Sequence, residues 1–546
     1  MAPPVPKAAG PFLAVPVCIV LIAMSARTSE AQPGPRDQPP NIVIVLADDL
    51  GYSDVSCFGG EISTPHIDRL AKEGLRFTQF YNCGQDSPTR AALLTGFYPH
   101  QVGMGHSTAD YRQPGYRGNL SREHATLAEL LGQGGYQTMM VGKWHLTPHV
   151  APEGPKHTWP VNRGFERFYG TIHGAGSYFA PVTLCRGGQF LDETDPDFYY
   201  TDRIAHHAGT FIEQAARGNK PFFLYVAFAA PHWPLHAPSL AIERQRARYA
   251  SGWDEVRKNR FERMQALGIL KRQWKPTPID ERVGPWELNQ LRDWQQRRME
   301  VYAAQVDLMD RAVGRILESL RQTGAEQNTL VLFLSDNGAS AEEIMPNWRG
   351  AGIPKETRAG RAVQVGNHPD ILPGAEDTYQ SYGIAWANVS NTPFRLYKGD
   401  VHEGGIATPL IVHWPAVLRQ GGQMTGQVGH VIDIVPTCLE IARIRYPAMY
   451  QGRNLAPLEG RSLAPILQGQ TRSEGKLFWE HAGNRAVRDG KWKLVARHRG
   501  PWELYDMEAD RTETANLAGQ HPAVVRDLSE SYAAWAKRCN VLPWHD

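Results

Sequence analysis

The sequence predicts an α/β fold: a large, mostly parallel central sheet with helices on both faces, plus a small C-terminal α+β domain with a short antiparallel sheet. Residues 41–47 form a continuous, β-branched apolar run, which is typical of a strand buried on both faces of a parallel sheet. Similar runs alternate with helical stretches further along the chain. After about residue 444 the pattern changes to short strands and turns.

The N-terminal segment predicts export. Lys7 precedes an apolar run at residues 12–24, and small residues follow it. This order is typical of a signal peptide, which we expect over residues 1–31, with a Pro/Gly-rich linker at 32–40. The protein is then periplasmic or secreted. A retained membrane anchor is the alternative, but the run contains Pro16 and is shorter than the roughly 20 residues that a spanning helix needs. We therefore expect no stable membrane insertion.

The large domain is predicted to span residues 41–444. Further strands are expected at residues 138–141, 222–228, 330–334 and 410–413, and helices at 67–73, 125–131 and 298–320. Ligands of such sheets bind beyond the carboxyl ends of the strands, so we expect the functional site in the loops that follow them. Residues 241–297 are charged and Trp-rich without an apolar strand. They predict a helical insertion over the site, with a solvated helical excursion as the alternative.

The C-terminal domain is predicted to span residues 445–546. A chain of 546 residues is too long for one ordinary core, which favours a second domain. Short strands are expected at residues 476–479, 491–495 and 503–505, and a terminal helix at 522–537.

Charge and cysteine content exclude two classes of protein. The chain has 58 basic and 56 acidic residues, a net charge of +2, so it has no overall basic surface and we expect no nucleic-acid partner. The five cysteines outside the signal segment are widely spaced, and no CxxC pair occurs. A dense disulfide framework and a CxxC-type zinc site are therefore excluded.

Acidic and amide side chains follow two of the predicted strands. Asp48 and Asp49 come directly after the first strand, and Asp336 and Asn337 follow the strand at 330–334. Three carboxylates and one amide are an all-oxygen ligand set that suits a hard cation such as calcium. Each pair taken alone is more often a turn or a helix cap. Their recurrence at two strand ends of one sheet favours a metal site.

Cationic side chains follow the strands as well. Lys143 and His145 follow the strand at 138–141, His232 and His236 follow the strand at 222–228, and Lys398 precedes a Gly-rich turn. Lysines and histidines at several strand ends predict a pocket for a small tetrahedral anion. A single histidine beside Trp or Pro is more often a packed structural residue, so the prediction depends on the recurrence.

The segment from Asp86 to Gly96 (Asp-Ser-Pro-Thr-Arg-Ala-Ala-Leu-Leu-Thr-Gly) resembles the signature of the type I sulfatases, or arylsulfatases, of the alkaline phosphatase superfamily. That signature is Cys-x-Pro-x-Arg followed by Thr-Gly, and Pro88 and Arg90 match it in register. Further matching motifs lie at residues 47–52, 142–145, 230–232, 335–338 and 503–506. The resemblance extends from about residue 40 to about residue 518.

The resemblance implies an alkaline phosphatase-like fold and hydrolysis of sulfate esters with one bound calcium ion. It implies calcium ligands at Asp48, Asp49, Asp336, Asn337 and the signature position Asp86. It implies that Arg90 orients the nucleophile. Sulfate binding or protonation of the departing oxygen would fall to Lys143, His232 and Lys398. His145 would be the base that releases product, and His236 would contact substrate only.

Asp86 is the departure from the family pattern, because the family has Cys or Ser there as the precursor of formylglycine. An aspartate cannot become formylglycine. Its carboxylate resembles the aldehyde hydrate in shape, but its charge repels sulfate, and nearby cations lower its pKa and its nucleophilicity. We therefore expect a sulfatase with weak or absent turnover on an aryl sulfate or a sulfated glycan.

Three alternatives stay open. Asp86 attacks directly and forms an acyl-sulfate. The chain is an inactive binder of sulfated glycans. The chain is a phosphoesterase of the same superfamily. No motif in the sequence specifies the natural substrate.

Overall fold

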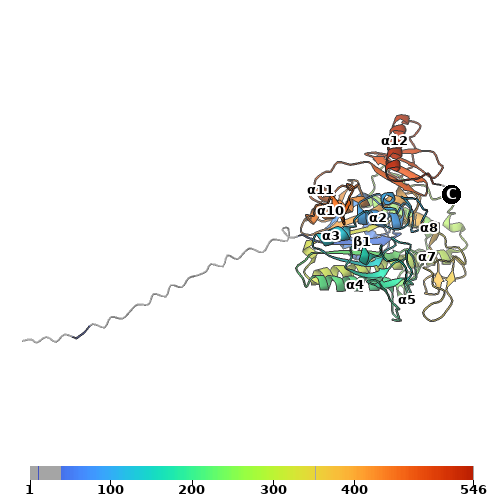
Figure 1. Cartoon of the computed structure of the whole chain (residues 1–546). Coiled ribbons are helices and arrows are strands. Elements are labelled where there is room, and N and C mark those ends of the chain that lie inside the picture. Colours follow the sequence, from blue (N-terminus) through green and yellow to red (C-terminus); the bar gives the residue numbers. More distant parts are fainter. Residues whose placement is uncertain (1–9, 12–38, 351, 545–546) are drawn as a thin grey trace, which may run out of the picture.

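The computed structural model describes residues 10–11, 39–350 and 352–544, so nearly all of the predicted export signal and most of the linker lie outside the described residues. A layered α/β domain carries a smaller domain with its own sheet (Figure 1). The predicted fold class is confirmed. Among the described helices, none combines the length and the apolar character that a bilayer crossing requires.

The central sheet has eleven strands, and five adjacent strands in its middle are parallel. In spatial order the strands are β12 (Gln423–Thr425), β2 (Leu75–Tyr81), β11 (Ala407–His413), β8 (Thr329–Ser335), β1 (Asn41–Asp48), β7 (Phe222–Pro231), β3 (Gln137–Lys143), β4 (Arg167–Thr171), β5 (Leu184–Arg186) and β6 (Gln189–Phe190), and β13 (Gly429–His430) pairs with β2. Strand β11 runs antiparallel to both of its neighbours. The parallel strands β8, β1, β7 and β3 therefore end at one edge of the sheet.

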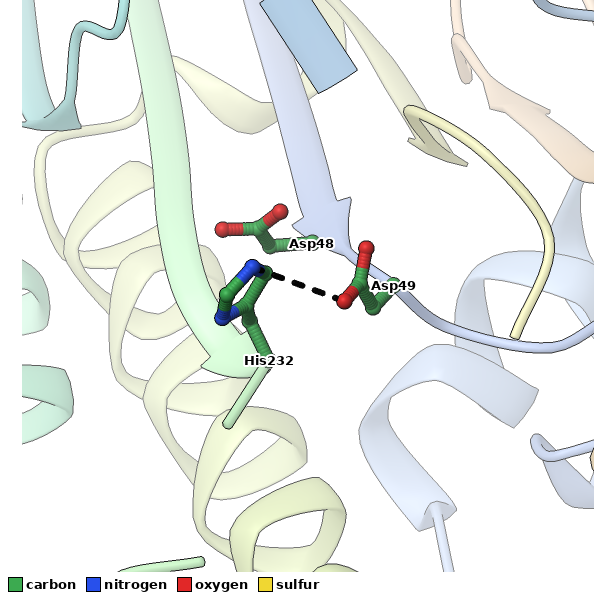
Figure 2. Close-up of side chains that lie close together, drawn as sticks. All are labelled: Asp48, Asp49 and His232. Atoms are coloured by element: carbon green, nitrogen blue, oxygen red, sulfur yellow. Dashed lines mark ion pairs between the residues drawn. The ribbon is translucent and has the colours of Figure 1, made fainter. Parts of the chain in front are cut away.

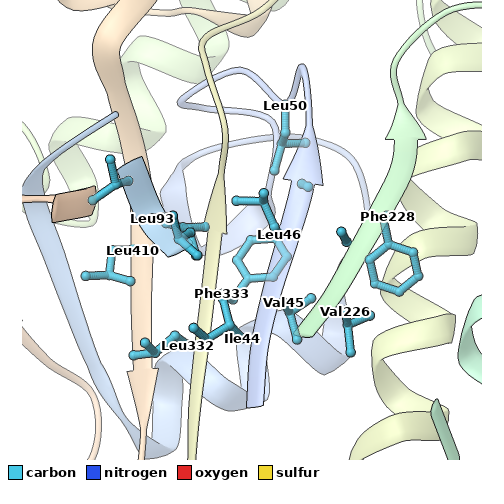
Figure 3. Close-up of a cluster of buried hydrophobic side chains, with 14 of the residues drawn as sticks. Ile44, Val45, Leu46, Leu50, Leu93, Val226, Phe228, Leu332, Phe333 and Leu410 are labelled. Carbon is cyan, nitrogen blue, oxygen red and sulfur yellow. The ribbon is translucent and has the colours of Figure 1, made fainter. Parts of the chain in front are cut away.

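Strand β1 is buried on both faces, as its unbroken apolar sequence predicts. Figure 3 shows its side chains Ile44, Val45 and Leu46 between those of β8 and β7. Every residue from Ile42 to Ala47 is at most 1% exposed. The sheet core thus holds β1 firmly, and the loop that follows it starts from a fixed point.

Helices cover both faces of the sheet. In Figure 1, α4 (Tyr200–Ala215) and α7 (Arg292–Gln322) lie on one side of β1, and α2 (Asp86–Thr95), α3 (Leu127–Gln133) and α10 (Ile434–Ile441) lie on the other. The large domain also contains α1 (Pro65–Glu73), α8 (Gly383–Ser390) and α9 (Glu403–Ile406). Helix α7 packs on α4 and β7, which explains its long apolar stripe.

The segment at 241–297 is only partly helical. It contains the end of α5 (Ser239–Glu243), all of α6 (Gly252–Ala266) and the start of α7, and most of residues 267–291 has no regular structure. The Arg260 guanidinium on α6 is fully buried, 2.6 Å from Asp54 Oδ1 and 2.7 Å from Glu61 Oε2. The helix is therefore packed against the loops after β1. Its predicted role over the site stays a prediction.

The C-terminal part contains a separate four-stranded antiparallel sheet and a terminal helix. The sheet consists of β16 (Leu477–His481), β17 (Asn484–Asp489), β18 (Trp492–Ala496) and β19 (Glu503–Asp506), and α12 (Pro522–Arg538) packs on it. Short elements precede it, namely β14 (Met449–Tyr450), β15 (Arg453–Asn454) and α11 (Ala464–Leu467), and β9 (Gln364–Val365) pairs with β10 (Thr378–Tyr379) in the large domain. The three predicted strands and the helix are confirmed, and β17 was not predicted.

Candidate active site at the carboxyl edge of the sheet

Four of the five parallel strands place polar side chains at one edge of the sheet. Strand β1 ends at Asp48 and β3 ends at Lys143, while His232 directly follows β7 and Asp336 directly follows β8. Because these strands are neighbours in the order β8, β1, β7, β3, the side chains that follow them meet. The structure thus brings these predicted residues together at this edge.

Asp86 is the first residue of α2 and points into this group. Its Oδ2 lies 3.2 Å from Lys143 Nζ and 2.9 Å from His145 Nδ1, and its Oδ1 accepts a 2.8 Å hydrogen bond from the Ser87 N–H. Burial alone would raise the pKa of Asp86, but His145 and Lys143, with Lys398, hold it well below its usual value. The helix N-terminus also favours an anion at this position. Asp86 is therefore a carboxylate.

Arg90 lies one turn further along α2 and is fully buried. Its Nη2 is 2.7 Å from Asp336 Oδ2 and 3.6 Å from Asp48 Oδ1, and its Nη1 donates a 3.0 Å hydrogen bond to the Lys143 carbonyl. Burial would lower the pKa of Arg90, but the two carboxylates raise it. Arg90 thus ties the start of α2 to the ends of three strands.

Asp48, Asp49 and His232 form a buried group that could hold a metal ion (Figure 2). One ligand atom of each lies within 4.8 Å of the others, and His232 Nε2 is 3.6 Å from Asp49 Oδ2. Asp48 Oδ1 and Asn337 Oδ1 are also buried and lack a hydrogen-bond partner. Buried oxygens without partners are costly, so a cation bound between them fits the residues present.

The charges of the site also fit a cation. The buried carboxylates are Asp48, Asp49, Asp86 and Asp336, and the buried cationic side chains are Arg90, Lys143 and Lys398. Burial raises the pKa of Asp48 well above its usual value despite Lys143, and it raises that of Asp336 despite Arg90. For Asp49, Lys398 and His232 outweigh burial and lower the pKa. The carboxylates outnumber the cationic side chains by one, and a divalent ion would compensate this excess.

The two histidines of the site are neutral in this environment. Burial lowers the pKa of His145 to about 4 and that of His232 to about 3, although Asp86 and Asp49 act in the opposite direction. His145 is the more accessible of the two, with 16% of its side chain exposed against 5% for His232. A neutral imidazole can accept a proton, which suits the predicted role of His145 as a base.

Gly174 lets the chain pass closely over His145. A Cβ atom at this position would lie only 2.2 Å from the His145 ring, so any larger residue would displace the ring or the loop. The next side chain, His173, has its ring centre 6.3 Å from that of His145. The segment at 173–175 therefore forms one wall of the site. No motif in the sequence marked it.

Lys398 reaches the site from a loop held by the C-terminal domain. Its Nζ is 2.9 Å from Asp49 Oδ1. Five residues later, the Glu403 carboxylate pairs with Lys493 Nζ and Arg511 Nε, each at 2.9 Å and all fully buried. The C-terminal sheet thus fixes the turn that follows Lys398.

His236 does not join the other predicted residues. Its Nε2 is 2.5 Å from the Thr378 carbonyl, and its Nδ1 accepts a 3.4 Å hydrogen bond from the Tyr178 N–H. In the described part of the chain, no hydrogen bond or ion pair connects its side chain with the charged group around Asp86. The structure places it in the packing behind the site.

Glu342 also lies at the site, although no motif in the sequence marks it. Its Oε2 lies 3.8 Å from Lys398 Nζ, and half of its side chain is exposed. It comes from a segment without regular structure or a matching motif. Only its position in space connects it with the site.

Comparison with known proteins identifies relatives along nearly the whole chain. A family model described as sulfatase matches residues 40–444, and one described as N-sulphoglucosamine sulphohydrolase, C-terminal, matches residues 395–536. An uncharacterised sulfatase of Schizosaccharomyces pombe is 34% identical over 93% of this chain and 95% of its own. The arylsulfatase of Klebsiella aerogenes is 33% identical over 80% and 94%, respectively. A crystal structure of Ps i-CgsB in complex with k-i-k-neocarrahexaose has a TM-score of 0.66 and 24% identity, and covers 93% of this chain and 95% of that one.

Proposed function

The chain belongs to the type I sulfatases of the alkaline phosphatase superfamily, a family of sulfuric ester hydrolases, and from this premise we propose that it is an exported sulfatase that binds calcium and sulfate esters but turns them over weakly or not at all. The observation that carries the proposal is Asp86. Its carboxylate occupies the position of the nucleophile and pairs with Lys143 and His145. The features of residues 1–31 support export.

The oxygen atoms of Asp48, Asp49, Asp86, Asp336 and Asn337 would hold the calcium ion. When bound, calcium would neutralise charge that develops on the sulfate oxygens. The unpartnered oxygens Asp48 Oδ1 and Asn337 Oδ1 support this assignment. An oxygen-rich set suits calcium better than the softer transition metals.

The cationic side chains would bind the sulfate group. Lys143, Lys398 and His232 surround the same space from β3, the loop before α9 and the end of β7. Arg90 is fully paired with carboxylates and a carbonyl, so it would position α2 rather than contact substrate. His145, neutral and partly exposed, would take up the proton when product leaves.

No neighbouring side chain can replace the missing nucleophile. Cys83 is buried, and burial raises the pKa of its thiol. The Asp86 carboxylate is engaged on both oxygens, by Lys143 and His145 on Oδ2 and by the Ser87 N–H on Oδ1. An anion held in this way is a poor nucleophile, which disfavours the direct formation of an acyl-sulfate.

The test is to restore the nucleophile. Asp86→Cys, co-expressed with a formylglycine-generating enzyme, should hydrolyse 4-nitrophenyl sulfate with many turnovers, because the rest of the site is in place. The unchanged chain should stay at the level of Asp86→Ala, measured by release of 4-nitrophenol.

Two outcomes would contradict the proposal. The first is turnover by the unchanged chain well above that of Asp86→Ala, in which case hydroxylamine trapping and oxygen-18 incorporation into Asp86 would test for an acyl-sulfate. The second is an inactive Asp86→Cys chain whose formylglycine is confirmed by mass spectrometry. Binding of sulfated glycans by that inactive form would favour a pure binding protein.

A further inference from the structure

Two loops lie beside the residues that we propose to bind sulfate, and together they are called the rim: the loop at 173–175 and the loop around Trp348. Gly174 lies against the His145 ring, and Gly352 packs on the neighbouring segment, since a Cβ on Gly352 would lie 2.1 Å from the Ala175 carbonyl oxygen. Trp348, from the same loop as Gly352, contacts Trp233, which directly follows His232. The loop around Trp348 therefore connects the two histidines of the site along its outer edge.

Two tryptophans form an aromatic surface on this rim. The ring of Trp233 is centred 4.4 Å from that of His232 and 5.2 Å from that of Trp348, which it meets edge to face. Trp348 is 43% exposed, so much of its ring faces solvent. An exposed indole fixed beside a polar pocket is a surface on which a ring of a ligand can stack.

Glu342 lies between this aromatic surface and the sulfate pocket. Its Oε2 accepts hydrogen bonds from Trp233 Nε1 at 2.7 Å and from Ser340 Oγ at 3.0 Å, and it lies 3.8 Å from Lys398 Nζ. Among the described residues, no hydrogen bond reaches its Oε1. One oxygen is therefore held in place, and the other is available to a donor on the ligand.

We propose that Trp233, Trp348 and Glu342 form the subsite for the alcohol part of the sulfate ester, and that this subsite selects a neutral ring that carries a hydroxyl group beside a single sulfate. The ring stacks on Trp348, and the hydroxyl donates to Glu342. A second sulfate or a carboxylate on the same ring is disfavoured, because the Glu342 carboxylate repels it. This inference rests on the proposed function and extends it to a substrate class, the monosulfated neutral sugars.

The test measures binding of three probes by isothermal titration. The full-length chain carries Asp86→Asn, which removes the repelling charge at the nucleophile position without supplying a nucleophile, and it is loaded with calcium. The probes are inorganic sulfate, galactose 6-sulfate and galactose 2,6-disulfate. We expect galactose 6-sulfate to bind more tightly than either of the others.

Substitutions in the subsite separate its two parts. Trp348→Ala should weaken binding of galactose 6-sulfate about five- to tenfold and change that of inorganic sulfate less than about twofold, because only the ring contact is lost. Trp348→Phe keeps an aromatic face and should restore most of the binding. Glu342→Gln should reduce the preference for the monosulfate over the disulfate by about tenfold.

The matched control is Met345→Ala, because Met345 lies in the same segment and is 67% exposed. It should leave all three affinities unchanged. The inference is overturned if Trp348→Ala leaves galactose 6-sulfate binding intact, if it weakens inorganic sulfate equally, or if the disulfate is the preferred probe before substitution. Absence of inorganic sulfate binding would instead overturn the proposed function, and this inference with it.

Discussion

At the scale of single residues, the carboxylate of Asp86 places a negative charge of this chain inside the proposed sulfate site. Lys143 and His145 contact it directly, and burial is not enough to raise its pKa against them. Lys143 is one of the groups that we propose to stabilise the charge of the sulfate. Asp86 at this position thus leaves the rest of the site in place. Its negative charge neutralises part of the positive potential of the site.

Arg90 should be the residue on which the stability of the empty site depends most. Arg90→Met leaves Asp336 buried without its cationic partner, and breaking a buried pair in this way costs about 3 to 5 kcal/mol of unfolding free energy. The change is measured by urea denaturation in the presence of a calcium chelator.

Arg246→Met is the matched control, because the pair of Arg246 with Glu243 is exposed on both sides. That substitution should leave the urea midpoint unchanged. A midpoint for Arg90→Met equal to that of the control would show that Arg90 does not hold the strand ends together.

The site residues that could be predicted from the sequence share one property. Asp48, Lys143, His232 and Asp336 each end or directly follow an apolar strand, so the parallel sheet brings them together. Glu342 and Trp348 come from an irregular segment, and their approach to the site depends on the path of that loop. His236 had the right position in sequence, but its ring is turned into the packing around Thr378.

At the scale of elements, the strands predicted in the large domain are apolar runs, whereas β2 and β17 were not predicted. Strand β1 is an unbroken apolar run, whereas β2 (Leu-Arg-Phe-Thr-Gln-Phe-Tyr) and β17 (Asn-Arg-Ala-Val-Arg-Asp) carry several polar residues. Strand β11 was predicted as a strand, but its antiparallel direction is set by its pairing with β2 and β8. The amino-acid composition of a strand indicates whether the strand is buried. It does not indicate whether the strand runs parallel or antiparallel to its neighbours.

The ion pairs of Glu403, at the start of α9, should make the unfolding free energy of the protein fall at acid pH. Burial would raise the pKa of Glu403, but Lys493 and Arg511 lower it to about 2, below its ordinary value of 4.5. These ion pairs therefore stabilise the fold fully above pH 4.5, and this stabilisation is lost as the pH falls from there to about 2. The contribution is on the order of 3 kcal/mol.

Glu403→Gln should remove this pH dependence. Its unfolding free energy should lie below that of the unchanged chain at neutral pH, and the two should converge through the acid window, as measured by urea denaturation at a series of pH values. Glu474→Gln, at an exposed glutamate, should track the unchanged chain throughout. A difference for Glu403→Gln that stays constant down to pH 2 would contradict the assignment.

At the scale of the whole molecule, the site is built jointly by the two predicted domains. The central sheet supplies the strand ends, while the C-terminal sheet fixes the turn after Lys398 through Lys493 and Glu403. Positive and negative side chains are concentrated at the site and nearly balance each other. The net charge of +2 for the whole chain therefore does not indicate where the site lies. A ligand that binds at this junction should stabilise both parts together.

Calcium should therefore raise the unfolding temperature of the whole chain. A ligand that binds only the folded state stabilises it by about 2.7 kcal/mol at a concentration 100 times its Kd. We expect a higher midpoint in calorimetry after calcium is added to chelator-treated protein, with both sheets unfolding later. Magnesium at the same concentration should have a smaller effect, because it demands a stricter octahedral geometry and gives up its water reluctantly.

Asp48→Asn separates metal binding from general stability. The substitution removes a proposed calcium ligand and the partner of Lys143. It should lower the midpoint without calcium, but its decisive effect is on the calcium-dependent shift, which should disappear. Asp527→Asn, at a carboxylate that is 71% exposed, should retain the full shift. If Asp48→Asn keeps the shift, calcium binds elsewhere on the molecule. If magnesium matches calcium in the unchanged chain, the oxygen ligands at the strand ends are not selective for the larger ion.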